Sequence, residues 1–231
     1  MIRAQGIFKS YRNGSIVAPV LKDVDLEVAR GEFLFLVGPS GSGKSTLLSI
    51  LGCVLGADAG TLDMLGKNIF AMSKRDLTRF RRDHLGFVFQ RFHLFKGLTA
   101  LENVRVPLDL RGEAKSDGNR VAKELLDAVG LTDKINSQIN QLSGGQRQRV
   151  AVARALAGKP DIVFADEPTA SLDAESGRKT VELLRALAKD RKTTVVVVTH
   201  DARILGYADR VVPLEDGKIR QATTGDAPGS V

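Results

Sequence analysis

The chain has 231 residues, of which 43% are hydrophobic and 26% are charged. This length can bury one sizeable core and is too short for two full domains, and the charged fraction excludes disordered, collagen-like and fibrous classes. The longest aliphatic runs are too short to span a membrane, and the N-terminal residues have no apolar stretch typical of a signal peptide. The single cysteine, Cys53, excludes an internal disulfide framework and a cysteine-based zinc site. We therefore expect a cytosolic chain that is soluble by itself.

The charge balance is basic: 34 Lys and Arg against 27 Asp and Glu give a formal net charge of +7. Such a balance suits a polyanionic partner, which can be a nucleic acid, a nucleotide or an anionic membrane surface. It is equally compatible with charges that are only solvated. The motifs must decide between these alternatives.

In chain order, the apolar periodicity predicts alternating strands and helices. Segments 2–11 and 20–28 alternate in polarity and are bounded by turns, as antiparallel strands are. Continuous apolar runs then predict strands buried on both faces of a parallel sheet at 33–37, 162–165 and 193–199. Helical patterns separate these strands at 45–55, 119–129, 145–157 and 176–190.

The remaining segments complete an α/β fold with a mostly parallel sheet. Residues 92–141 have helical periodicity and no convincing strand, so they predict a helical insertion. The segment 210–219 resembles the first two strands and predicts another antiparallel strand. The tail at 221–231 has the composition of a mobile end.

A glycine-rich segment follows the first buried strand directly and precedes an apolar helix. It reads Gly-x4-Gly-Lys-Ser, in the strand, loop and helix context of a phosphate-binding loop. Small residues let successive backbone N–H groups point at an anion, and the helix presents its positive N-terminal end. We expect Lys44 to reach the β- and γ-phosphates and Ser45 to bind Mg²⁺. The predicted nucleotide-binding residues are Gly38, Pro39, Ser40, Gly41, Ser42, Gly43, Lys44, Ser45 and Thr46.

Two adjacent carboxylates, Asp166 and Glu167, follow the apolar run 162–165. Adjacent acids repel each other and are costly at the end of a buried strand unless a cation offsets them. We expect Asp166 to hold Mg²⁺, as the Walker B acid of phosphate-loop NTPases does, and Glu167 to act as the general base for the attacking water. The alternative is a solvated acidic turn before Pro168, which the phosphate-binding loop disfavours.

The segment Leu142-Ser-Gly-Gly-Gln146 opens a predicted helix. Ser143 is a good N-cap, the two glycines allow another surface to approach, and the helix end attracts a second anion. The alternative is an ordinary capped helix that binds no anion, and periodicity alone does not exclude it. Placed between a phosphate-binding loop and an acidic strand, this pentapeptide resembles the signature of the ATP-binding cassette family.

The resemblance covers about residues 2–220 and implies further roles. Tyr11 matches the aromatic residue that stacks on adenine, and Gln90 matches the Q-loop glutamine that contacts Mg²⁺ and faces the membrane subunit. Asp173 matches the D-loop aspartate. His200 matches the switch histidine, expected to contact the γ-phosphate and to orient Glu167 or water.

The family resemblance also implies a RecA-like core, an antiparallel β subdomain and a helical subdomain at about 90–149, all within one cassette of residues 1–231. The implied cofactors are ATP and Mg²⁺. In such proteins two cassettes, here expected to be a homodimer, pair head to tail, and each signature closes over the ATP held by the other. The residues expected to act on the partner's ATP are Ser143, Gly144, Gly145 and Gln146.

Further predictions concern residues outside these motifs. His84 and His93 lack metal-ligand spacing and are interpreted as structural, and Cys53 is expected to pack within the helix after the phosphate-binding loop. The basic segment 79–84 is either a solvated helix face or a face that docks at the inner membrane surface.

Within the family, segments 47–53 and 98–104 and the insertion at 12–19 resemble the MacB/LolD group of lipoprotein-release and macrolide-export ATPases. Residues 57–60 and 170–171 depart from the group's usual pattern. The resemblance implies an ATPase subunit of an export or extraction complex, at the cytoplasmic face of the membrane, with a separate membrane subunit that has few helices and a large outer domain. It does not imply a nucleic acid partner. An FtsE-like regulator of envelope or division machinery and a solute importer remain alternatives.

Overall fold

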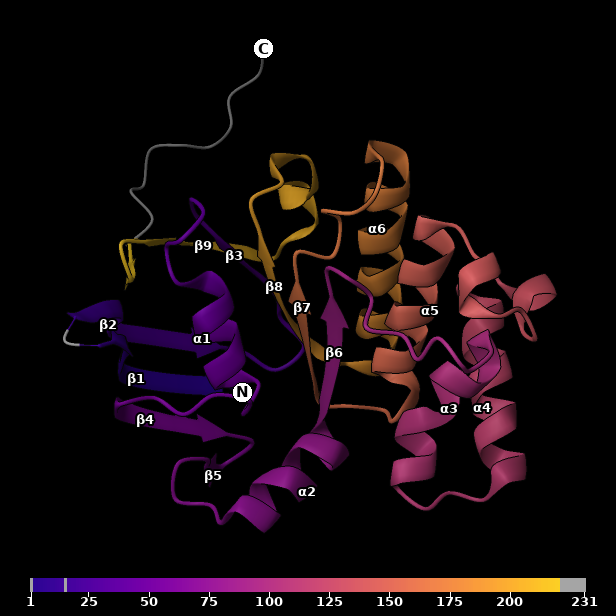
Figure 1. Ribbon diagram of the computed structural model, residues 1–231, viewed down its shortest axis with the longest axis horizontal. Coiled ribbons are helices and arrows are strands. Elements are labelled where there is room, and N and C mark those ends of the chain that lie inside the picture. Colours follow the sequence, from indigo (N-terminus) through magenta and orange to yellow (C-terminus); the bar gives the residue numbers. More distant parts are fainter. Residues whose placement is uncertain (1, 15, 221–231) are drawn as a thin grey trace.

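The structure, a computed structural model, describes residues 2–14 and 16–220 and contains two β-sheets (Figure 1). The tail that is predicted to be mobile, 221–231, lies outside the described residues. The larger sheet has the strand order β10-β9-β3-β8-β7-β6. Its strands are β3 (Phe33–Val37), β6 (Leu85–Phe89), β7 (Ile162–Asp166), β8 (Thr194–Thr199), β9 (Arg210–Glu215) and β10 (Lys218–Ile219).

The parallel register of this sheet brings the ends of four strands together. Val37 at the end of β3 pairs with Thr199 at the end of β8. Asp166 at the end of β7 pairs with Phe89 at the end of β6, and β7 also pairs with β8. The loops that follow these strands therefore emerge side by side at the carboxyl edge, where open parallel sheets bind ligands.

The larger sheet separates two cores because alternate side chains along each strand point to opposite faces. Phe35 and Val197 contribute to a core that includes residues of four helices, α3 to α6. Leu36 and Val196 contribute to the other core, with α1 and the smaller sheet. The main helices are α1 (Lys44–Leu51), α3 (Ala100–Leu110), α4 (Lys115–Ala128), α5 (Gly144–Ala157) and α6 (Ala174–Arg191).

The smaller sheet is antiparallel, with the order β2-β1-β4-β5. Its first two strands confirm the predictions for 2–11 and 20–28, whereas the sequence pattern does not predict the other two. Hydrophobic residues of β1, β2 and β4 belong to the same core as α1 and one face of the larger sheet. The strands are β1 (Ile2–Asn13), β2 (Ile16–Val28), β4 (Ala59–Met64) and β5 (Lys67–Asn68).

The α/β class and the buried parallel strands are confirmed, but the prediction of an antiparallel strand over 210–219 is only partly confirmed. β9 runs parallel to β3, with Leu34 opposite Arg210, and it is antiparallel only to the two-residue β10. Along β9 only Val212 and Leu214 are buried. The alternation of apolar residues along β9 results from burial of one face of the strand. It does not indicate whether the strand is parallel or antiparallel to its neighbour.

The helices agree with their predicted positions, except that α1 ends four residues earlier than the predicted helix 45–55. α1 stops at Leu51, because Cys53 adopts a left-handed conformation at φ 58°, so Cys53 lies in the following turn and not within the helix. Residues 92–141, all of them described, contain helices and turns with a single bridge between Thr99 and Gln138. The described residues also contain three short 3-10 helices: η1 (Thr132–Lys134), η2 (Ile139–Gln141) and η3 (Ala202–Tyr207).

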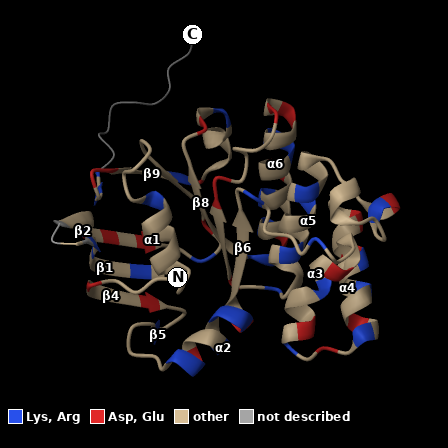
Figure 2. Cartoon of the chain, in the orientation of Figure 1, with Lys and Arg blue, Asp and Glu red and all other residues tan. Residues whose placement is uncertain are grey.

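The helix α2 (Lys74–His84) leads into β6, and basic residues mark it clearly (Figure 2). Ser73 caps its N-terminus by accepting a hydrogen bond from the backbone N–H of Asp76. Only Phe80 is buried along this helix. Within residues 2–14 and 16–220, every helix is too short or too polar to cross a membrane.

Gly86 of β6 allows close contact with α5. A Cβ at this position would overlap the carbonyl oxygen of Ala155 on α5 and crowd Pro160. Gly86→Ala should therefore lower the free energy of unfolding by about 1–3 kcal/mol, since the strand and helix must move apart. Gly56→Ala is the matched control, because a Cβ there meets no atom within 4 Å. Urea denaturation measures both changes, and equal stability of the two variants would contradict the packing argument.

Candidate functional site: a phosphate-binding loop at the carboxyl edge of the sheet

The phosphate-binding loop connects β3 to α1. At two of its glycine positions, no other residue fits. Gly38 has φ 153°, and a Cβ there would overlap the carbonyl oxygen of Leu214. Gly43 has φ 102°, and a Cβ there would lie 2.9 Å from the Val20 oxygen. Side chains at either position would force the loop away from its neighbours. The sequence motif therefore reflects both backbone conformation and space.

Lys44 begins α1 and is only 7% exposed. Its ammonium group donates hydrogen bonds to the carbonyl oxygens of Gly38 and Pro39 at 2.8 and 2.9 Å. A buried ammonium group needs such partners. These contacts hold the positive charge against the backbone of the loop, at the cavity that Lys44 lines.

Ser45 and Asp166 join the phosphate-binding loop to the end of β7. The Ser45 hydroxyl donates a hydrogen bond to Asp166 Oδ1 at 3.0 Å. Burial raises the pKa of Asp166 above its usual value, and the negative charge of Glu167 adds to the rise, while the Ser45 hydrogen bond and the charge of Lys44 oppose it. A hydroxyl and a carboxylate are hard oxygen ligands, and a cation here would offset the buried negative charge. The residues present therefore fit Mg²⁺.

Glu167 follows Asp166 in a left-handed conformation, at φ 46°. Its Oε1 atom lies 2.8 Å from Nδ1 of His200, the residue after β8. Its other carboxylate oxygen, Oε2, is buried and has no hydrogen-bond partner within the described structure. A carboxylate held by one oxygen and unpaired at the other is suited to accept a proton from a bound molecule.

These residues surround one cavity of about 710 Å³. The structure thus brings together six of the nine predicted phosphate-binding residues, Glu167 and His200, and the predicted adenine and Q-loop residues. Gly38, Pro39, Ser42 and Asp166 do not line the cavity themselves. Val20 of β2 also lines the cavity, and its apolar side chain carries no sequence motif that could have identified it. The lining residues are Tyr11, Val20, Ser40, Gly41, Gly43, Lys44, Ser45, Thr46, Gln90, Glu167 and His200.

The signature segment, residues 142–146, does not contribute to this cavity. The Ser143 side chain accepts a hydrogen bond from the N–H of Gln146, and the Gln146 side chain accepts one from the N–H of Ser143, which forms a capping box. The start of α5 lies beside the loop before α6: a Cβ on Gly144 would lie 3.7 Å from Leu172, and one on Gly145 would lie 3.3 Å from Ser176.

Asp173 also lies outside the cavity and accepts a hydrogen bond from the N–H of Ser176, as the N-cap of α6. This hydrogen bond lowers the pKa of Asp173 below its usual value. The nearby Ser171 hydroxyl donates to the carbonyl oxygen of Gln90 at 3.1 Å. This bond joins the D-loop directly to the Q-loop, a contact that no sequence spacing indicates.

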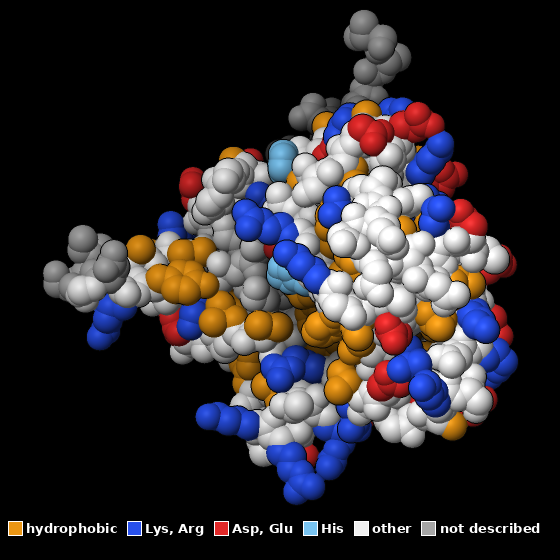
Figure 3. Space-filling model, turned by 45° about the vertical axis from the view of Figure 1, so that its right-hand side comes forward, with side chains coloured by type: hydrophobic (Ala, Val, Ile, Leu, Met, Phe, Trp, Pro, Cys, Tyr) orange, Lys and Arg blue, Asp and Glu red, His pale blue; other side chains and the backbone are white. Residues whose placement is uncertain are grey.

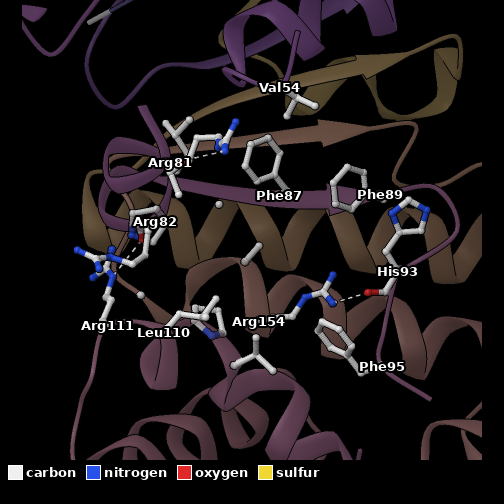
Figure 4. A pocket seen from close by; sticks show the side chains of 18 residues that line it. Val54, Arg81, Arg82, Phe87, Phe89, His93, Phe95, Leu110, Arg111 and Arg154 are labelled. Atoms are coloured by element: carbon white, nitrogen blue, oxygen red, sulfur yellow. Dashed lines mark hydrogen bonds between the residues drawn. The ribbon is translucent and has the colours of Figure 1, made fainter. Parts of the chain in front are cut away.

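A second cavity, the apolar groove, lies between α2, β6, α3 and α5, and orange side chains mark its floor in the space-filling view (Figure 3). It has a volume of about 490 Å³. Figure 4 shows Phe87 and Phe89 on β6 with Arg81 and Arg154 extending toward the groove. Further apolar lining comes from Val54, Phe95, Pro107 and Leu110, and further positive charge from Arg82 and Arg111.

Arg154 of α5 connects this groove to the Q-loop. Its guanidinium group donates to the carbonyl oxygens of His93 and Phe92 at 2.6 and 2.9 Å. Both acceptor residues have positive φ, at 45° and 60°. Burial lowers the pKa of Arg154 to about 10, which still leaves it charged at neutral pH. The turn that follows Gln90 is thus held by the helix that begins at the signature segment.

The surroundings of His84 and Cys53, which the sequence predicts to be structural, agree with roles outside the nucleotide site. His84 Nδ1 lies 2.8 Å from Asp161 Oδ2, so His84 does pair with an acid, although not in a metal site. Burial raises the pKa of the Cys53 thiol to about 12, which makes it unreactive at neutral pH. Among the described residues, no cluster of three or more His, Cys, Asp or Glu side chains could hold a metal by itself.

Fold and site together define a phosphate-loop nucleotide-binding protein: a glycine-rich loop and helix N-terminus beside an acidic strand end. Comparisons with known proteins define the family. A model described as ABC transporter matches residues 21–170. The chain is 45% identical to an uncharacterized ABC transporter ATP-binding protein, MJ1508, of Methanocaldococcus jannaschii, over 95% of this chain and 97% of that one.

Two further relatives extend the comparison. The macrolide export ATP-binding/permease protein MacB of Shewanella sp. is 43% identical over 95% of this chain, which spans 34% of that protein's length. Among solved structures, a dimeric, post-hydrolysis state of the ATP-binding cassette MJ0796 bound to ADP and Pi has a TM-score of 0.88 and 41% identity, covering 96% of this chain and 97% of that one. The chain belongs to the ABC transporter family, as its ATP-binding cassette and ATPase component.

The raised pKa of Asp166 predicts how pH affects stability. In the folded chain this carboxyl keeps its proton to higher pH than in the unfolded chain, so its contribution to stability falls as pH rises through the raised pKa. Without nucleotide, Asp166→Asn should therefore melt at higher temperature than the wild type at pH 7. The difference should disappear as the pH falls below the usual pKa of aspartate.

Thermal denaturation between pH 3 and pH 8 measures this difference, with Asp190→Asn at an exposed site of α6 as the control. Adding Mg²⁺ and ATP should raise the melting temperature of the wild type and the control much more than that of Asp166→Asn. A variant that is less stable than the wild type at pH 7 without nucleotide would contradict the burial argument.

Proposed function

We propose that the chain is the ATP-binding and ATP-hydrolysing subunit of an export or extraction complex, which powers a separate membrane subunit through ATP-driven dimerisation of two cassettes. The observation that carries the proposal is the single cavity in which Lys44 and Ser45 face Glu167 and His200. Within this proposal the chain is one cassette, with a helical subdomain at about 90–149.

The residues of the cavity divide the chemistry between them. The phosphate-binding loop and Lys44 bind the triphosphate of ATP, and Tyr11 stacks on its adenine. Ser45, Asp166 and Gln90 hold Mg²⁺, which supplies positive charge to the phosphates during the reaction. Glu167 accepts a proton from the attacking water, and His200, 2.8 Å away, orients Glu167 and contacts the γ-phosphate.

The location of the signature segment supports the proposed dimerisation. Residues 143–146 form a capped helix N-terminus, which attracts anions, yet they lie outside the nucleotide cavity of their own chain. A second copy placed head to tail would bring this helix end to the ATP of its partner, with Asp173 beside it. The dimeric state of the similar cassette MJ0796 supports this arrangement.

The apolar groove is the proposed contact with the membrane subunit. Val54 and Leu110 are each 65% exposed at the groove, and exposed apolar residues around a concave surface are typical of protein interfaces. The groove also meets the turn after Gln90, so that one short segment contacts both the nucleotide cavity and this surface. A cassette bound in this way would lie at the cytoplasmic face of the membrane.

The direction of transport rests on similarity. The MacB relatives have export in their name and join an ATP-binding region to a permease in one chain. The same pairing between separate chains would fit a cassette such as this one. The membrane subunit would select the substrate, because in this proposal the nucleotide cavity binds ATP and the apolar groove binds the membrane subunit.

Glu167→Gln tests the proposed hydrolysis. The amide cannot accept the proton from water, so the rate of ATP hydrolysis should fall by at least about 100-fold while ATP binding remains. Because ATP is then not consumed, the variant should accumulate as a dimer with ATP, measured by light scattering after size exclusion. Glu182→Gln, at an exposed position of α6, should behave as the wild type. Undiminished hydrolysis in Glu167→Gln would refute the role of this residue.

Leu110→Glu tests the groove as the contact with the membrane subunit. A charge at this exposed position should leave folding and the ATP hydrolysis of the isolated cassette unchanged, and should abolish co-purification with the membrane subunit. Val17→Glu, on β2, is the control because Val17 is also exposed, at 53%, and does not line the groove. Co-purification that survives Leu110→Glu would place the contact elsewhere.

A further inference from the structure

The basic charge of the chain is concentrated on and next to α2. Residues 67–84 contain six Lys and Arg against two Asp, a net charge of +4 out of +7 for the whole chain. The nucleotide site does not use these charges, because none of them lines its cavity. Figure 2 shows basic residues at both ends of α2, and Figure 3 shows Lys and Arg side chains that project from the same part of the molecule. Nucleotide binding therefore does not explain the positive charge of residues 67–84.

The helix geometry collects these charges on one side. At about 100° per residue, Arg75, Arg79 and Arg82 fall within about 60° of one another around α2, and Lys74 borders them. Phe80 points the other way and is buried in the core. We call Lys74, Arg75, Arg79 and Arg82 the cationic face; all four are exposed.

Intramolecular ion pairs neutralise only part of the cationic face. Arg82 binds Asp83 at 2.7 Å, and Arg79 lies 3.8 Å from Asp76. Within the described part of the chain, Lys74 and Arg75 have no carboxylate within ion-pair distance. Exposed pairs of this kind contribute little to stability, so an external anion can compete for these guanidinium groups.

The shape of the cationic face favours a lipid surface over a folded or peptide partner. It is the convex outer side of a helix with long side chains, and Arg82 alone among its residues lines the apolar groove. Such a surface can recognise charge density and offers no pocket for a particular side chain. Phe70, just before α2, is 39% exposed, and a half-exposed aromatic residue next to basic residues is typical of membrane interfaces.

We propose that the cationic face of α2 binds the anionic headgroups of the membrane. The apolar side of α2 packs inward, so the contact is electrostatic and peripheral, without insertion of the helix. Its orientation rests on the proposed function: α2 also supplies Thr78 and Arg81 to the apolar groove, so a membrane subunit docked there brings the cationic face toward the bilayer.

The test measures binding of the full chain to vesicles by co-sedimentation. Vesicles of phosphatidylcholine with 30% phosphatidylglycerol should bind the wild type, and pure phosphatidylcholine vesicles should not. Each basic residue near an anionic surface contributes roughly fivefold to the partition coefficient. The triple variant Lys74→Glu, Arg75→Glu, Arg79→Glu should therefore bind at least about 100-fold more weakly, and wild-type binding should decline steeply between 50 and 300 mM salt.

The matched control makes the same change of net charge elsewhere, as Lys123→Glu, Lys189→Glu, Lys218→Glu at exposed sites of α4, α6 and β10. It should keep most of the binding. Arg81 and Arg82 are left unchanged, because Arg81 donates a hydrogen bond to the carbonyl oxygen of Cys53 and both residues line the groove. Circular dichroism and ATP hydrolysis of both triple variants should equal those of the wild type.

Three outcomes would overturn the proposal. The wild type could fail to prefer anionic vesicles, or the control could lose as much binding as the α2 variant, which would show a general effect of net charge. Alternatively, the α2 variant could lose the membrane subunit in detergent without lipid, which would assign the face to an acidic protein segment. Failure here leaves the proposed function standing, because Glu167→Gln and Leu110→Glu test hydrolysis and the groove independently of lipid.

Discussion

The parallel hydrogen-bond register between β3, β8, β7 and β6 is the constraint on which the nucleotide site depends. The register aligns the ends of these strands, so that the phosphate-binding loop, His200, Glu167 and Gln90 meet without being near one another in the chain. A shift of one residue in any pair would turn the following side chain to the other face. The apolar side chains that fix this register on both faces are therefore as important to the site as the polar residues that form it.

At this edge of the sheet, neighbouring protein groups hold the charged side chains of Lys44, Asp166 and Glu167 in place. Lys44 donates hydrogen bonds to backbone oxygens, and Asp166 accepts one from the Ser45 hydroxyl. One carboxylate oxygen of Glu167 contacts His200, while the other is buried without a hydrogen-bond partner among the described residues. The surrounding protein therefore orients these groups without help from a ligand, which is the arrangement expected of a preorganised site.

A short turn links the nucleotide cavity to the apolar groove. Gln90 lines the nucleotide cavity, while His93 and Phe95 line the apolar groove a few residues later. Arg154 holds the backbone between them, and Ser171 holds Gln90 from the side of the D-loop. These hydrogen bonds connect the nucleotide cavity to the groove, and we expect them to carry the proposed coupling of nucleotide and membrane subunit.

The sequence by itself determined the local chemistry: the phosphate-binding loop, the acidic pair, the capped signature helix and the strands buried on both faces. Each of these depends on backbone conformation or periodicity within a few residues, so composition and spacing are sufficient to predict them. Only the tertiary structure decided the parallel direction of β9, the strands β4 to β6, the contact between Ser171 and Gln90, and the apolar groove. These features arise from segments far apart in the chain, and no local pattern encodes which distant partner a strand or side chain will meet. The sequence also indicated the basic helix face near residues 79–84, but only the fold showed that burial of Phe80 in the core leaves Lys74, Arg75, Arg79 and Arg82 exposed on the outer side of α2.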